Sequence, residues 1–170
     1  MNRDFEGSWN IIELLETFTA YFLTNYLLPG SIFVILNKDL ISLKVLSYDV
    51  IVQLLLYTFV GIVLSRISSI VFKPSLRRIL KMQDEKYEDY LSAKKKDNEI
   101  EVFFRIKNMY SIFALIFLLL TFKMIIRTCL TFTIENLILI ILYFCIHVLF
   151  GISYKRQHNY MKKRIQIYTN

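Results

Sequence analysis

The chain has 170 residues, of which 55% are hydrophobic, and it carries a formal net charge of +7. A soluble domain of this length disperses its apolar residues, whereas here they gather in four nearly uncharged stretches, which argues against soluble and secreted classes. The largest remaining piece, about residues 73–108, is too short to bury a sizeable core. We therefore expect one membrane domain over residues 1–170 and no separate catalytic domain.

The N-terminal segment is acidic rather than basic, and no small-x-small cleavage site follows the first apolar stretch, so we expect that stretch to stay in the membrane. Apolar residues spaced by three and four within residues 5–16 predict a short amphipathic helix before it. This helix either lies at the interface or extends the first span inward.

The first span covers about residues 17–37, close to the ~20 apolar residues that a helix needs to cross a bilayer. Pro29-Gly30 lies within it and predicts a kink near Leu27 or Leu28. Asn25 is an amide at membrane depth, whose best-attested use is a hydrogen bond between helices.

The second span covers about residues 50–72 and contains a second amide, Gln53. Gly61, Ser65 and Ser69 follow at i, i+4 and i+8, so one helix face is lined by small residues that permit close helix approach. We expect Gly61, Ser65 and Asn25 to form a packing seam. Arg66 beside this face either snorkels to the headgroups or contacts a pore or a partner.

The loop at residues 73–108 opens with Lys73-Pro74, and proline suits the first turn of a helix. Apolar spacing from there predicts one amphipathic helix over residues 75–93, a break at 94–98 and a second helix that runs into the third span. The basic residues of this loop that we single out for partner or lipid contacts are Arg77, Arg78, Lys81, Lys94, Lys95 and Lys96.

The third and fourth spans cover about residues 109–126 and 136–154. His147 lies inside the fourth span, where it is either a neutral side chain hydrogen-bonded to another helix or a group that gates by protonation. The tail, residues 155–170, contains five basic residues and no acidic one. It suits anionic lipid, with nucleic acid as the competing polyanion, and Lys162, Lys163 and Arg164 are its candidate contacts.

The distribution of charge predicts the topology. In a four-span arrangement, 17 of the 21 Lys and Arg residues lie on the side of both termini and the central loop. Because positive residues stay on the cytoplasmic side, we place both termini and the loop in the cytoplasm.

Catalytic and metal-binding patterns are not found in the sequence. Neither His147 nor His158 has a Cys, Asp or Glu three or four residues on, and the chain has only four glycines and no glycine-rich phosphate loop. Cys129 and Cys145 do not form a Cys-x-x-Cys pair. We therefore predict no catalytic residues, no metal, no cofactor and no enzymatic activity.

Several segments are familiar as a set: Ser65–Ser69 running into Lys73-Pro74, then Tyr87–Leu91 and Lys94–Asp97. With this plan the chain resembles small four-span membrane proteins of bacterial anti-phage defence loci, namely the accessory proteins of type VI-B CRISPR loci and the membrane subunit of the Kiwa system. The resemblance implies a membrane partner of a cytoplasmic defence effector that forms an oligomeric pore.

The sequence as a whole predicts an all-α, four-transmembrane-helix bundle with amphipathic cytoplasmic helices between spans two and three. Its predicted function is that of a defence accessory that forms homo-oligomers in the inner membrane and couples a cytoplasmic protein partner or signal to membrane perturbation or effector localisation. The alternative is a small transporter or proton-coupled channel that uses His147 and Glu135.

Overall fold

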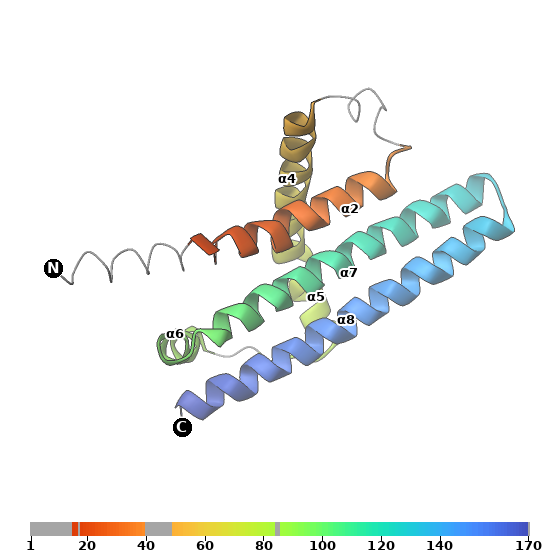
Figure 1. The fold of residues 1–170 in the computed structure, drawn as a ribbon. Coiled ribbons are helices and arrows are strands. Elements are labelled where there is room, and N and C mark those ends of the chain that lie inside the picture. Colours follow the sequence, from red (N-terminus) through yellow and green to blue (C-terminus); the bar gives the residue numbers. More distant parts are fainter. Residues whose placement is uncertain (1–14, 17, 40–48, 84–85, 170) are drawn as a thin grey trace. The chain divides into compact units, whose positions relative to one another are not determined.

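The computed structural model describes residues 15–16, 18–39, 49–83 and 86–169, and in these the regular structure is helical, without strands. Four helices of this part of the chain are long and apolar enough to cross a membrane: Phe18–Leu36, Val50–Ile79, Glu99–Leu130 and Ile134–Thr169 (Figure 1). The architecture is therefore that of a multi-pass helical membrane protein. The helix predicted for residues 5–16 lies outside the described residues except at its end.

The chain divides into two compact units, with the boundary after Ile62. The first unit contains η1 (Leu23–Leu27), α2 (Leu28–Leu36) and most of α4 (Val50–Ile67). The predicted irregularity before Pro29 takes the form of η1, a π-helical turn. In a regular α-helix the proline ring meets the carbonyl four residues earlier, which belongs to Asn25, and a wider turn relieves that clash.

Within this unit the backbones of two helices touch at two glycines. A Cβ atom added to Gly30 would lie 1.8 Å from the carbonyl oxygen of Tyr57, and one added to Gly61 would lie 1.9 Å from the carbonyl oxygen of Tyr26. No side chain larger than hydrogen fits at either position. The helix that contains Pro29 therefore crosses α4 at its own glycine, directly after the proline.

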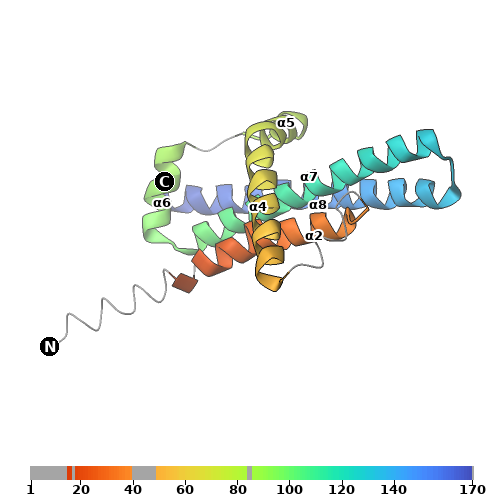
Figure 2. The same cartoon turned by 90° about the horizontal axis from the view of Figure 1, so that it is seen from above.

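The second unit contains the end of α4, η2 (Ser68–Phe72), α5 (Lys73–Ile79), α6 (Tyr87–Lys96), α7 (Glu99–Leu130) and α8 (Ile134–Thr169). α7 and α8 pack side by side as a long hairpin, and α6 lies at its open end (Figures 1 and 2). α7 has 32 residues and α8 has 36, so their lengths are about 48 Å and 54 Å at 1.5 Å per residue. Both exceed the ~30 Å of hydrocarbon in a bilayer, so both continue well beyond their apolar parts.

The single helix predicted for residues 75–93 is wrong, because α5 ends at Ile79 and α6 begins at Tyr87. Lys81 adopts a left-handed conformation with φ of 50°. Its N–H donates to the Arg78 carbonyl and the N–H of Met82 donates to the Arg77 carbonyl, which is the bonding pattern of a Schellman motif. Apolar spacing did not reveal this end, since the motif usually contains glycine where this chain has Lys81.

Two clusters of buried side chains hold the second unit together. The first, which we call the α5 core, consists of Phe72, Leu76, Ala114, Leu115 and Tyr154. The second, the α6 core, consists of Ala93, Ile100, Met161 and Ile165. The α6 core joins α6 to the ends of α7 and α8, and we call these three segments the platform: α6, residues 99–108 of α7 and residues 155–169 of α8.

Candidate functional site

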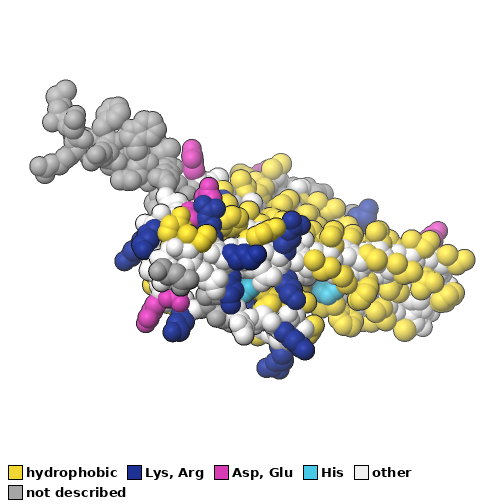
Figure 3. Space-filling view, turned by 90° about the horizontal axis from the view of Figure 1, so that it is seen from below, with side chains coloured by type: hydrophobic (Ala, Val, Ile, Leu, Met, Phe, Trp, Pro, Cys, Tyr) yellow, Lys and Arg dark blue, Asp and Glu magenta, His cyan; other side chains and the backbone are white. Residues whose placement is uncertain are grey.

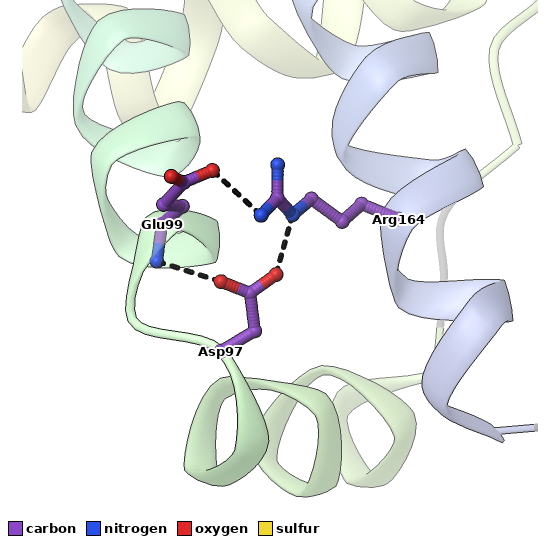
Figure 4. A network of polar contacts seen from close by, with 3 residues as sticks. All are labelled: Asp97, Glu99 and Arg164. Atoms are coloured by element: carbon purple, nitrogen blue, oxygen red, sulfur yellow. Dashed lines mark hydrogen bonds and ion pairs between the residues drawn. The ribbon is translucent and has the colours of Figure 1, made fainter.

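An ionic clasp closes the platform around Arg164, which lies on α8. The guanidinium group donates to the Asp97 carboxylate from Nε and lies 2.6 Å from a Glu99 carboxylate oxygen through Nη2 (Figure 4). It also stacks over the Phe103 ring at 5.4 Å. Asp97 and Glu99 flank the connection between α6 and α7, so one side chain of α8 fixes the position of both.

Asp97 is the central acceptor of this clasp. The hydrogen bond from Arg164 lowers the pKa of Asp97 below its ordinary value of 3.8, and the backbone N–H of Glu99 contributes in the same direction against the effect of burial. That N–H donates to the second carboxylate oxygen at 3.0 Å. Asp97 is therefore ionised at neutral pH, and both of its oxygens are used inside the platform.

Two further contacts tie α6 to its neighbours. The Lys94 ammonium lies 2.8 Å from a Glu101 carboxylate oxygen on α7, and the Lys96 ammonium donates to the Tyr168 carbonyl of α8 at 3.0 Å. The hydrogen bond to Glu101 raises the pKa of Lys94. These two pairs are exposed, so each one stabilises the platform less than the contacts of Asp97 do.

A polar cluster joins η2 to α7 where the α5 core begins. Ser68 Oγ donates to Ser111 Oγ at 3.0 Å, and Ser111 Oγ donates to the Asn108 carbonyl at 2.7 Å. The Lys73 ammonium donates to Asn108 Oδ1 at 2.8 Å and to Ser69 Oγ at 3.2 Å. Asn108 and Ser111 were not among the predicted site residues, although two polar residues at the start of an apolar stretch are a signal of such bonding.

His147 of α8 bonds to the neighbouring helix of the hairpin. Its Nδ1 lies 2.8 Å from the Ala114 carbonyl oxygen, and because a carbonyl can only accept, Nδ1 carries the hydrogen. The ring centres of Phe72 and Phe144 lie 6.1 and 6.2 Å from the centre of the imidazole ring. This arrangement corresponds to the first of the two roles considered for His147, a hydrogen bond between helices.

The other candidates for packing or gating belong to η1 and α4. Asn25 and Gln53 belong to the first unit, and Asn25 is fully buried in η1 with its Nδ2 donating to the Tyr21 carbonyl. Gly61 lies at the close approach of the helices, whereas Ser65 is half-buried and Arg66 is exposed on α4. Asn25 is next in sequence to Tyr26, whose carbonyl Gly61 contacts.

Some of the basic residues predicted to contact a partner or lipid instead contact other residues of this chain, and others are exposed. Arg77 donates to the Tyr154 hydroxyl at 3.3 Å, and Arg164, Lys94 and Lys96 belong to the platform contacts described above. Lys162 is half-buried on α8. The exposed residues outside these contacts are Arg78, Lys81, Lys95 and Lys163. Nearly half of the predicted contact residues thus serve the fold of this chain.

Open grooves line α8 in and beside the platform, and two of them adjoin. One, of about 300 Å³, is lined by Ile152, Lys155, Arg156, Asn159, Tyr160 and Lys163. The other, of about 570 Å³, is lined by Phe103, Tyr160, Lys163, Arg164, Ile167 and Tyr168. They share Tyr160 and Lys163, so together they form one strip that contains both basic and aromatic side chains.

Among the residues that the structure describes, no three His, Cys, Asp or Glu side chains are grouped so that they could hold a metal ion. The two cysteines are exposed on α7 and α8 as free thiols. The arrangement that the geometry does provide is a set of cations and hydrogen-bond donors at the open end of a long apolar hairpin. Comparison of the chain with protein-family models, with curated proteins and with solved structures finds no match.

Proposed function

We propose that this chain is a non-enzymatic membrane protein in which the platform receives a cytoplasmic protein partner and transmits that binding to the bilayer. The proposal rests on the observation that α7 and α8 are each one continuous helix. Each runs without a break from the platform through the apolar hairpin. A displacement of the platform is therefore applied directly to two membrane helices.

The contacts within the platform support this role. Its helices share the α6 core and are fixed to one another by the clasp of Arg164 with Asp97 and Glu99. A segment with its own core and ionic contacts moves as one body, whereas a loose loop between two spans would absorb a partner's force. The orientation with the platform in the cytoplasm rests on the positive-inside distribution of Lys and Arg.

The setting that we propose for this coupling is bacterial antiviral defence, in the inner membrane and as a homo-oligomer. It rests on the sequence resemblance to the membrane proteins of defence loci. Large apolar side chains are exposed along the membrane segments, among them Ile51, Leu55 and Phe59 on α4 and Ile138 and Ile141 on α8. Such side chains need lipid or further copies of the chain as neighbours.

A phage challenge tests this function. Cells that express the chain together with its neighbouring genes should form fewer plaques than cells without it. Arg164→Ala, which opens the clasp, should remove protection while the protein still inserts in the membrane, whereas Lys86→Ala, a change of an exposed cation before α6, should not. Full protection by Arg164→Ala, or no protection by the wild-type chain, would contradict the proposal.

The alternative, a small transporter or proton-coupled channel, requires His147 and Glu135 to act along one path. The two residues are 12 positions apart on α8, which corresponds to about 18 Å along the helix. In liposomes with a pH gradient, a proton channel predicts that His147→Gln abolishes proton flux. The platform account predicts that this variant keeps protection against phage, since the amide still offers a donor to the Ala114 carbonyl.

A further inference from the structure

The basic residues that are exposed on α8 beyond its apolar part are not the same as the basic residues that the sequence predicted to contact lipid. Of the three basic residues proposed in the tail, Arg164 is engaged by Asp97 and Glu99, and Lys162 is half-buried. The exposed cations of this segment are Lys163, which is the third proposed residue, and Lys155 and Arg156, which the sequence did not single out. All three line the groove of about 300 Å³ together with Asn159 and Tyr160.

This groove directly follows the apolar part of α8. Its first lining residue is Ile152, and exposed apolar side chains such as Phe144, Leu149 and Ile152 continue toward the turn of the hairpin. Figure 3 shows Lys and Arg side chains gathered beside a long apolar surface. A cationic groove next to a surface that lipid chains cover lies at the level of the lipid headgroups.

The direction of the helix turns the basic side chains toward the bilayer. The Cα–Cβ bonds of an α-helix tilt toward its N-terminus, and α8 leaves the apolar region through its C-terminal half. Lys155, Arg156 and Lys163 therefore lean back toward the headgroups. Lys163 lies eight residues beyond Lys155, or about 12 Å along the helix axis. Its long side chain brings the ammonium group back toward Lys155 and so closer to the headgroups.

The groove is also ordered by contacts within α8. Arg156 Nε donates to the Tyr160 hydroxyl at 2.9 Å, and the guanidinium group lies 5.5 Å from the centre of that ring. Neither Lys155 nor Lys163 forms an ion pair with a residue that the structure describes. The segment from Lys155 to the C-terminus contains no Asp or Glu. The charge of the groove is thus positive and suits a phosphate group.

We propose that Lys155, Arg156 and Lys163, with Asn159 and Tyr160, form a binding site for the phosphate headgroup of an anionic phospholipid. The inference depends on membrane insertion alone and is independent of the platform's protein partner. The site would fix the depth of α8 in the bilayer, because the bound headgroup stays at the membrane surface.

Lipid titration followed by native mass spectrometry tests the site on the full-length protein in detergent. Dioleoyl phosphatidylglycerol should bind in preference to dioleoyl phosphatidylcholine. The triple variant Lys155→Gln, Arg156→Gln, Lys163→Gln should weaken phosphatidylglycerol binding by about 100-fold, from roughly fivefold per basic residue near the surface. Far-ultraviolet circular dichroism should show that the variant keeps the helical content of the wild type.

A matched control separates the site from net charge. The variant Lys38→Gln, Lys86→Gln, Arg127→Gln removes one arginine and two lysines, all exposed and outside α8, and should leave phosphatidylglycerol binding within twofold of the wild type. Equal losses in both variants, or no loss in the α8 variant, would overturn the proposal. It would also be overturned if millimolar inorganic phosphate or a short RNA displaced the lipid, since the groove would then bind soluble polyanions.

Discussion

At the scale of single residues, the glycines of this chain have different roles. Gly30 and Gly61 lie against backbone carbonyls, whereas a Cβ at Gly151 would meet only Leu76 Cδ1, at 4.0 Å. Gly61→Ala should therefore force two helices apart and destabilise the protein by about 1–3 kcal/mol. Gly151→Ala, the control, should be neutral or stabilising by up to about 1 kcal/mol, because alanine favours the helix.

Thermal unfolding of both glycine variants in the same detergent checks this prediction. The midpoint for Gly61→Ala should fall and that for Gly151→Ala should not. Equal midpoints would show that the first unit does not depend on the close approach at Gly61.

Lys81 is the second residue whose backbone makes a prediction. It occupies the left-handed position that ends α5, and a non-glycine residue there is disfavoured by about 1 kcal/mol. Lys81→Gly should raise the free energy of unfolding by about that amount. The same substitution at Lys95, inside α6, should lower it by up to about 1 kcal/mol. Chemical denaturation of the two variants beside the wild type measures both changes, and a destabilised Lys81→Gly would contradict the assignment.

At the scale of elements, the clasp makes the attachment of α6 sensitive to acid. The pKa of Asp97 is lower in the folded protein than its ordinary value of 3.8, so its contribution to stability is complete above that value and is lost as the pH falls through the folded pKa. Arg164 stays charged throughout this range. The platform should therefore keep the contribution of Asp97 from neutral pH to about pH 4 and lose that contribution progressively below.

Unfolding midpoints measured between pH 7 and pH 3 in the wild type and in Asp97→Asn check this dependence. The difference between the two proteins should shrink below pH 4, where the wild-type carboxylate becomes protonated. A constant difference over the whole range would mean that the charge of Asp97 does not hold α6.

The elements that could be predicted from the sequence are those defined by local properties of the chain. Blocks of apolar residues predicted the four long helices, since length and hydropathy are local properties of the sequence. The end of α5 at Lys81 was missed because an unusual residue occupies the turn. The pairing of Arg164 with Asp97 was missed because it joins residues 67 positions apart, and spacing along one helix contains no information on such contacts.

Among the candidate sites, His147 and Gly61 were singled out because polar and small residues are rare within apolar stretches. Their partners are the backbone carbonyls of Ala114 and Tyr26. Every residue has such a carbonyl, so the sequence does not indicate which one is used. The sequence identifies the basic residues of the tail but does not show which of them are exposed. Only the packing of α8 shows that Lys155 and Arg156 are exposed while Arg164 forms an ion pair with Asp97.

At the scale of the whole molecule, α8 continues as one helix from the apolar hairpin into the platform. Residues that face the α5 and α6 cores recur at Tyr154, His158, Met161 and Ile165, with Arg156 and Lys163 exposed between them. This period is that of an α-helix packed on one side. Partner binding can reach the membrane only if this period persists outside the bilayer.

Spin-label scanning of residues 145–167 in liposomes, after Cys129→Ser and Cys145→Ser, measures this directly. We expect labels up to about Ser153 that face away from α7 to contact lipid, and labels beyond Ser153 to alternate between immobilised and water-exposed positions with the helical period. Labels that are uniformly mobile and water-exposed from Lys155 onward would contradict it, because the tail would then be separate from the membrane hairpin.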